Sequence, residues 1–190
     1  MALIKILVMR KYLFFISFLL LAVLSNNSCT DPVDECEGVE CGNGQCEQGN
    51  CKCDYGWSGS DCSSKRITPL IGDWTGELKC LTNTDTITLR IKEIGNSVDV
   101  LKINTVDLVF NIGTTPLSFD SFTMNAIVDS SFNSFVIDTL EIKQNFNDQE
   151  LLVLVSGDGK KIEGDKLNLN LNFTLKNQGI GFKCTGVFDK

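Results

Sequence analysis

The 190-residue chain contains nine cysteines, and their number and spacing point most clearly to a specific chemistry. Six of them fall within residues 36–62 with the spacing Cys-x4-Cys-x4-Cys-x4-Cys-x-Cys-x8-Cys. So short a segment cannot bury enough apolar surface to fold unaided, and disulfides supply the missing stability in small exported modules. A zinc cluster is the competing interpretation, but zinc sites favour Cys-x2-4-Cys pairs and reduced thiols. We therefore expect a disulfide-stapled module and no metal site.

The N-terminus predicts that the chain is exported. Lys5, Arg10 and Lys11 precede the apolar residues 12–24, and a polar run follows. This order of charged, apolar and polar regions is typical of a signal peptide. A membrane-spanning helix is the alternative, but it needs about 20 apolar residues. We predict a signal peptide over residues 1–28 and an oxidising destination, in which most thiols are paired.

An odd number of cysteines leaves one without a partner, and Cys29 is that residue, because it directly follows the predicted leader. The pair Ser28-Cys29 resembles the lipobox of bacterial lipoproteins, in which a small residue precedes the cysteine that receives a lipid. The resemblance implies lipidation of Cys29 and a membrane anchor. The alternative is a secreted, non-lipidated protein with a free or intermolecular thiol.

Residues 29–35 form a short acidic tether of about 20 Å at full extension. Acidic residues just after a lipidated cysteine resemble the surface-export signal of some Gram-negative lipoproteins. We expect an outer-membrane lipoprotein that faces the exterior. A periplasm-facing orientation is the alternative.

The second half of the cysteine-rich segment resembles an epidermal-growth-factor-like (EGF-like) domain. Cys53 is followed by Asp-Tyr-Gly-Trp-Ser-Gly and then by Cys62, as in that family. The resemblance implies an EGF-like module over residues 36–62 with the pairs Cys36–Cys46, Cys41–Cys51 and Cys53–Cys62. Spacing alone does not choose among the pairings of six cysteines. Calcium is not expected, because the acidic motif of calcium-binding EGF-like domains is incomplete at Pro32.

After a linker over residues 63–70, residues 71–190 show a period of two, which predicts half-buried antiparallel strands. The clearest case alternates Leu and Phe with Asn and Thr over residues 167–175. Nine strand candidates occur, of which two short ones near Val98 to Ile112 can form one bent strand, giving eight. Four groups predict turns. They are Gly95-Asn96-Ser97, Asp129-Ser130, Gly157-Asp158-Gly159 and Asn177-Gln178-Gly179.

Cys80 and Cys184 lie in the first and last candidate strands on inward-facing positions. A bond between them requires these strands to be neighbours, as in an even-stranded meander that closes on itself. Gly72-Asp73-Trp74 resembles the Gly-x-Trp start of lipocalin-like barrels. We therefore predict an all-β fold with an antiparallel β-barrel of about eight strands. A two-sheet sandwich is the alternative.

Composition excludes several functions. The chain has no histidine, and its net charge is −7, which disfavours a nucleic-acid partner. It also lacks the usual motifs for nucleophilic catalysis and phosphate binding. Carboxylates occur at turns or outward positions, where they are expected to be solvated; they are Asp73, Asp138, Glu141, Asp158 and Glu163. We expect neither an enzyme nor a cofactor.

Two hypotheses for the function remain, and they differ in what the barrel interior holds. In the first, the anchored protein contacts proteins or glycans through its surface, and large inward residues fill the barrel. In the second, the barrel carries a small apolar ligand. The residues expected to point inward are Phe110, Phe122, Phe135, Phe173, Phe182 and Phe188. Their bulk favours the filled barrel and hence the first hypothesis.

Overall fold

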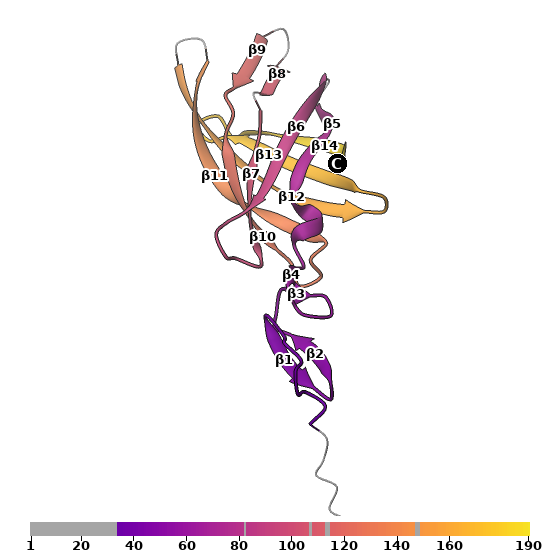
Figure 1. The fold of residues 1–190 in the computed structure, drawn as a ribbon. Helices are drawn as coiled ribbons and strands as arrows, with labels where there is room; N and C mark the ends of the chain where they lie inside the picture. Colours follow the sequence, from indigo (N-terminus) through magenta and orange to yellow (C-terminus); the bar gives the residue numbers. More distant parts are fainter. Residues whose placement is uncertain (1–33, 82, 107, 113–114, 147–148) are drawn as a thin grey trace, which may run out of the picture. The chain divides into compact units, whose positions relative to one another are not determined.

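The computed structural model describes residues 34–81, 83–106, 108–112, 115–146 and 149–190. Gly38 to Lys190 form one compact unit. Its strands and a short 3-10 helix appear in Figure 1. In the cysteine-rich segment they are β1 (Gly44–Glu47), β2 (Asn50–Cys53) and β3 (Trp57–Ser58); β4 (Ser64–Lys65) and η1 (Thr68–Leu70) follow it. Two antiparallel pairs, β1 with β2 and β3 with β4, order this segment.

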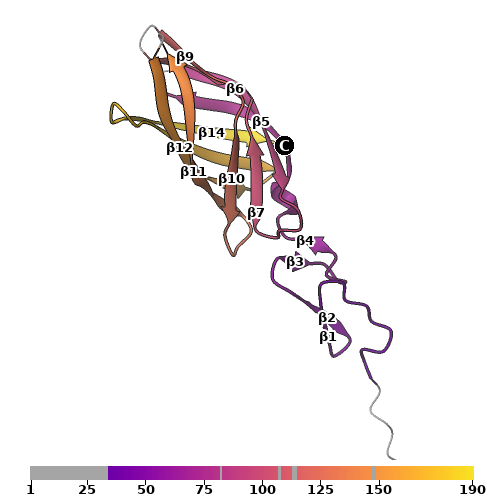
Figure 2. The ribbon, with the colours of Figure 1, turned by 90° about the vertical axis from the view of Figure 1, so that its left-hand side faces the viewer.

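The larger part of the chain forms a closed antiparallel barrel of eight strands (Figures 1 and 2). Its strands are β5 (Gly72–Cys80), β6 (Asn83–Glu93), β7 (Val100–Asn104), β10 (Thr123–Val128), β11 (Ser134–Phe146), β12 (Gln149–Ile162), β13 (Lys166–Leu175) and β14 (Ile180–Asp189). Closure requires β14 to pair with β5, so that no strand of the barrel is left with an open edge. The predicted barrel is confirmed, and the alternative sandwich is wrong.

The strand count of eight is correct, but the predicted way of reaching it is wrong. β8 (Leu108–Ile112) does not continue β7; it leaves the barrel and pairs with β9 (Thr115–Phe119). The two strands form a separate hairpin, and β10 pairs directly with β7 in place of β8. β9 was not predicted from the sequence; it contains Pro116, and proline lacks the N–H that a central strand needs.

The predicted turn at Gly157-Asp158-Gly159 is also wrong, because these residues lie inside β12. Gly157 and Gly159 are buried and alternate with the exposed Asp158. A Cβ atom at Gly159 would overlap the ring of Phe135 on the neighbouring strand. The glycine therefore serves packing, since it makes room for an aromatic ring of the neighbouring strand.

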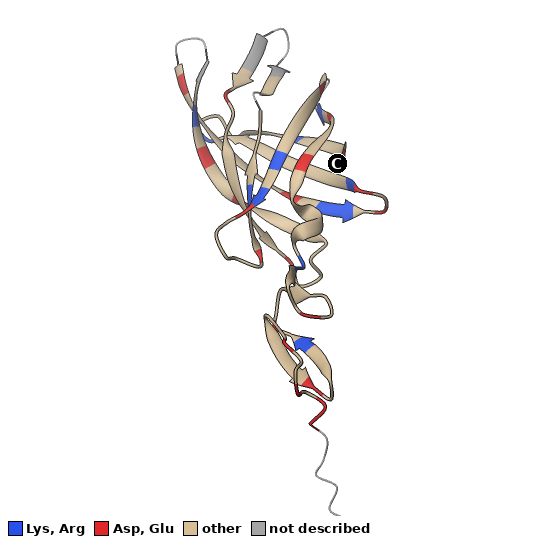
Figure 3. Ribbon diagram, in the orientation of Figure 1, with Lys and Arg blue, Asp and Glu red and all other residues tan. Residues whose placement is uncertain are grey.

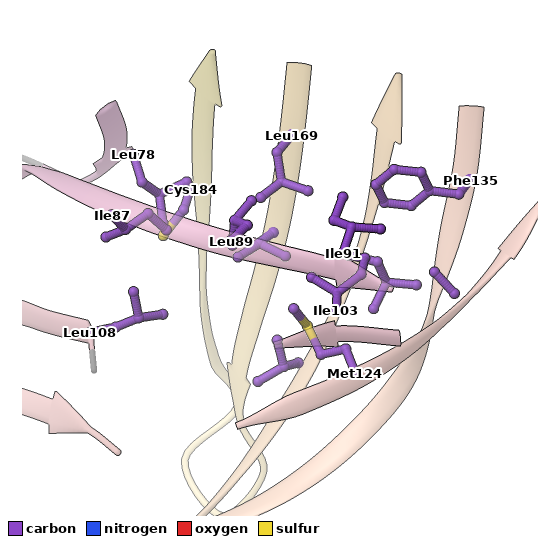
Figure 4. Packing of buried hydrophobic residues seen from close by; sticks show 14 of the residues in the cluster. Leu78, Ile87, Leu89, Ile91, Ile103, Leu108, Met124, Phe135, Leu169 and Cys184 are labelled. Carbon is purple, nitrogen blue, oxygen red and sulfur yellow. The ribbon is translucent and has the colours of Figure 1, made fainter. Parts of the chain in front are cut away.

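Inward side chains of all eight strands meet in one buried hydrophobic cluster, part of which Figure 4 shows. Phe173 stacks on Phe182 with ring centroids 5.1 Å apart. Among the phenylalanines expected to point inward, Phe135, Phe173, Phe182 and Phe188 are buried. Phe122 is partly buried against the cluster. The side chain of Phe110 lies outside the described residues. The buried inward side chains that the structure describes thus pack into one cluster.

The segment predicted as a linker contributes to this core. Ile67 and Leu70 are fully buried and belong to the hydrophobic cluster. The Leu70 carbonyl, at the end of η1, accepts a hydrogen bond of 2.9 Å from the buried indole N–H of Trp74. This bond satisfies the one polar atom of a fully buried tryptophan. The segment therefore also joins the packing of the barrel.

Candidate functional site

Most of the predicted cysteine chemistry can be located in the structure. The bonds Cys41–Cys51 and Cys53–Cys62 are present as the EGF-like resemblance implied. Cys36 and Cys46 are each disulfide-bonded, which is what their predicted pairing requires. Cys29, the predicted lipidation site, lies outside the described residues. Across the described ranges, no helix has the length and apolar character needed to cross a membrane.

Cys80 and Cys184 form the disulfide predicted between the first and last barrel strands. They lie directly opposite each other where β5 pairs with β14, with Cα atoms 4.2 Å apart. Both side chains are buried in the core. The bond therefore joins two strands that are 104 residues apart in sequence at the seam where the barrel closes.

The five carboxylates considered for catalysis are exposed and dispersed. Asp73 pairs with Arg90 at 2.8 Å, and this hydrogen-bonded ion pair lowers the pKa of Asp73. Glu141 pairs with Lys176 at 2.7 Å, and Asp158 accepts a 2.8 Å hydrogen bond from Asn170. Among the residues that the structure describes, no cluster of three or more His, Cys, Asp or Glu side chains is placed to hold a metal ion.

One candidate site is a groove on the outer wall of the barrel, with a volume of about 890 Å³. It runs across β13, β14 and β5 and reaches β6. Its side chains stand in cross-strand rows that follow from the pairing register. One row contains Asn168, Val187 and Glu77, and the next contains Asn170, Thr185, Lys79 and Thr84. Strands are about 4.8 Å apart, so neighbours in a row can contact the same partner group.

Polar groups in this groove are available for a partner. Glu77 and Lys79 form no ion pair with another described residue, although they lie on the same face of β5. Lys166 and Asp189 pair with each other at 2.7 Å at one end of the groove. Figure 3 shows that both signs of charge occur along the barrel strands. The groove therefore offers a donor, an acceptor and an amide on neighbouring strand positions.

An apolar contact lies among these polar groups. Val187 is 48% exposed and sits between Asn168 and Glu77 in its row. A valine that points to solvent from a strand gains nothing from burial in the fold itself. Together with the amides and charges, it gives the amphipathic lining that proteins use for sugar rings or peptide side chains.

The alternation over residues 167–175 predicted that Asn168 and Asn170 face outward, but the sequence did not predict that they share a site with residues of β14 and β5. The Asn residues of β13 alternate with core leucines, which fixes their face. Their neighbours on β14 and β5 lie far away in sequence, and only the closure of the barrel brings them together. The one sequence feature that could have pointed to the groove is the absence of lysine and glutamate from the outer face of residues 168–174.

No protein-family model matches this chain, and no curated protein matches it. Two solved structures are similar to it. The first, described as EF1p2_mFAP2b bound to DFHBI, is 11% identical with a TM-score of 0.45; the likeness covers 66% of this chain and 96% of that one. The second, a redesigned beta barrel named b11L5F_LGL, is 12% identical with a TM-score of 0.41. This likeness covers 66% of this chain and 94% of that one. The fold itself is established by the strand pairing: this chain forms an all-β, eight-stranded closed barrel preceded by a disulfide-rich segment.

Proposed function

We propose that this is an exported, lipid-anchored, non-catalytic protein that contacts a protein or glycan outside the cell through the outer wall of its barrel. The EGF-like module between the anchor and the barrel acts as a stapled spacer. The observation that carries the proposal is the groove across β13, β14 and β5, whose polar side chains are not used by the core.

The packing of the barrel supports recognition on the outside. A carrier of a small apolar molecule needs apolar side chains around an open interior. Here Trp74, Phe135, Phe173 and Phe188 are at most 1% exposed and pack into one cluster with their neighbours. By contrast, the groove residues face solvent and combine hydrogen-bonding groups with Val187. A contact protein is the function that this distribution favours.

Filling the groove is expected to abolish the contact. Thr185→Arg places a long cation at the centre of the groove from an exposed strand position, so the core is unaffected. With fluorescently labelled full-length protein on arrays of polysaccharides and surface proteins, we expect binding by the native chain and a loss of at least about tenfold in the variant.

Ile127→Arg is the matched control, because Ile127 is 52% exposed on the outer face of β10, outside the groove. This variant should bind like the native protein. Equal binding by native protein and Thr185→Arg, or no binding by the native chain, would contradict the proposal.

Lipidation of Cys29 is tested separately. Cells fed an alkyne fatty acid should incorporate it into the native protein, since the predicted lipobox ends at Cys29. Cys29→Ala should carry no label and should appear in the medium or the periplasm. Label that persists in the mutant would rule out this anchor while leaving the groove proposal intact.

A further inference from the structure

A second pocket lies next to β4 and η1 and is independent of the groove. It has a volume of about 440 Å³, which is in the range of small-ligand sites. One wall is the chain around Ser64 to Pro69, and the other is the β10–β11 loop at Ser131 to Asn133. Its lining combines hydroxyl and amide groups with two cations, Lys65 and Arg66, in a protein whose net charge is −7.

The two cations are in different states. Lys65 Nζ lies 2.7 Å from Glu93 Oε2, and its side chain is only 15% exposed, so its charge is neutralised. Arg66 is exposed and forms no ion pair with any described residue. Its guanidinium carbon lies 4.3 Å from the centre of the Phe132 ring. Stacking occupies the face of the guanidinium and leaves the N–H groups along its edges free to donate.

Phe132 is held in an unfavourable backbone conformation at this position. Its φ of 60° lies in the left-handed region, which bulky residues rarely adopt. The ring is nonetheless 3% exposed and also contacts Tyr55, with centroids 5.3 Å apart. Such strain persists where the surrounding structure imposes it, often at functional sites. Here the unfavourable conformation places the buried Phe132 ring beneath the guanidinium of Arg66, and this aromatic platform orients Arg66.

Hydrogen bonds stabilise the loop that carries this platform. The Asp129 carboxylate accepts bonds from the hydroxyls of Ser131 and Ser134, at 2.8 Å and 2.7 Å. These bonds, first that from Ser134, lower the pKa of Asp129 to about 2, so the carboxylate remains charged at neutral pH. The loop is therefore ordered by its own side chains, and the pocket is formed before any ligand arrives.

We propose that this pocket binds the carboxylate of an acidic sugar residue, with Arg66 as its bidentate partner. A carboxylate matches the fork of a guanidinium, whereas a phosphate or sulfate polyanion would need more than one free cation against this negative net charge. Ser64 and Asn133 line the pocket with a hydroxyl and an amide that can bond sugar hydroxyls, and the exposed Pro69 offers apolar surface to the sugar ring. An acidic peptide is the less favoured ligand, because it would leave these hydroxyl-binding groups unused.

The test is isothermal titration of the full chain with D-glucuronic and D-galacturonic acid, with glucose and galactose as neutral controls and an acidic dipeptide as the competing ligand. At least one acid should bind and neither neutral sugar should. Arg66→Gln should weaken binding by about tenfold to a hundredfold, the value of one charge-assisted bidentate contact. Arg66→Lys keeps the positive charge but loses the bidentate geometry of the guanidinium. Its affinity should lie between those of the native protein and Arg66→Gln.

Near-ultraviolet circular dichroism verifies that each variant is folded. Phe132→Leu removes the aromatic platform but keeps Arg66, and it should also weaken binding of the acid. Thr185→Arg should bind the acid normally, so failure of the groove proposal and failure of this one are distinguishable. No binding of either acid, equal binding by Arg66→Gln, or tighter binding of the acidic dipeptide would overturn the proposal.

Discussion

Replacing Cys80 and Cys184 together by alanine is expected to lower the free energy of unfolding by roughly 4 to 5 kcal/mol. The bond closes a loop with a sequence separation of 104 residues, and the entropy that it removes from the unfolded chain grows with loop length. In the folded state, β5 and β14 remain paired through their ladder, so the variant should keep its barrel. Urea unfolding followed by far-ultraviolet circular dichroism measures the change.

Removal of Cys41–Cys51 is the matched control, because its sequence separation is only 10. The chain-entropy argument predicts a smaller loss, roughly 3 kcal/mol or less, from so short a loop. This loss should be confined to the cysteine-rich segment and leave the unfolding midpoint of the barrel unchanged. A barrel that is equally stable with and without Cys80–Cys184 would show that the seam does not depend on the disulfide.

Trp74→Ala is expected to cost about 3 to 5 kcal/mol of unfolding free energy. The indole is fully buried, and its N–H is bonded to the Leu70 carbonyl. Alanine removes the packing of the largest fully buried side chain and leaves a cavity in the hydrophobic cluster that Ile67 and Leu70 share with Trp74. Urea unfolding measures the loss.

Trp74→Phe separates the two contributions. It retains much of the apolar volume but leaves the buried Leu70 carbonyl without its donor, which costs about 1 to 3 kcal/mol. Val136→Ala, at a position that is 62% exposed on the barrel exterior, should change stability by less than about 0.5 kcal/mol. A Trp74→Ala variant as stable as Val136→Ala would mean that this end of the core is not packed as described.

The fold was largely predictable because its main signals are local. Alternation of Leu and Asn over residues 167–175 determines which side chains face the core. The inward positions of Cys80 and Cys184 then required the terminal strands to be neighbours, and barrel closure follows from that. Both arguments need only a period of two and the geometry of a disulfide.

Other parts of the fold depended on contacts that a local pattern does not contain. Gly157 and Gly159 are typical turn residues, yet they lie within β12, where a Cβ atom would overlap the Asn170 backbone at Gly157 and the Phe135 ring at Gly159. β8 has an ordinary strand pattern, and nothing in it indicates that its partner is β9 and not β7. Likewise, Ile67 and Leu70 are too few to mark a segment as part of the core.

The candidate sites were less predictable than the fold. The groove brings Asn168, Val187 and Glu77 into one row from three strands, two of which are more than 90 residues from the third in the printed sequence. Arg66 and Phe132 are likewise distant in sequence, and the positive φ of Phe132 has no sequence signature. The sequence indicates which faces are exposed; strand order determines which exposed groups meet.

In the proposed function, recognition takes place on the outer wall of the barrel and not in its interior. The most direct measurement compares binding of the partner found on the arrays by two folded variants. Thr185→Arg blocks the groove and leaves the core intact, whereas Phe173→Leu loosens the core and leaves the groove intact. We expect Thr185→Arg to lose binding and Phe173→Leu to keep it. Loss of binding in Phe173→Leu with retention in Thr185→Arg would contradict the proposed function and favour a ligand inside the barrel.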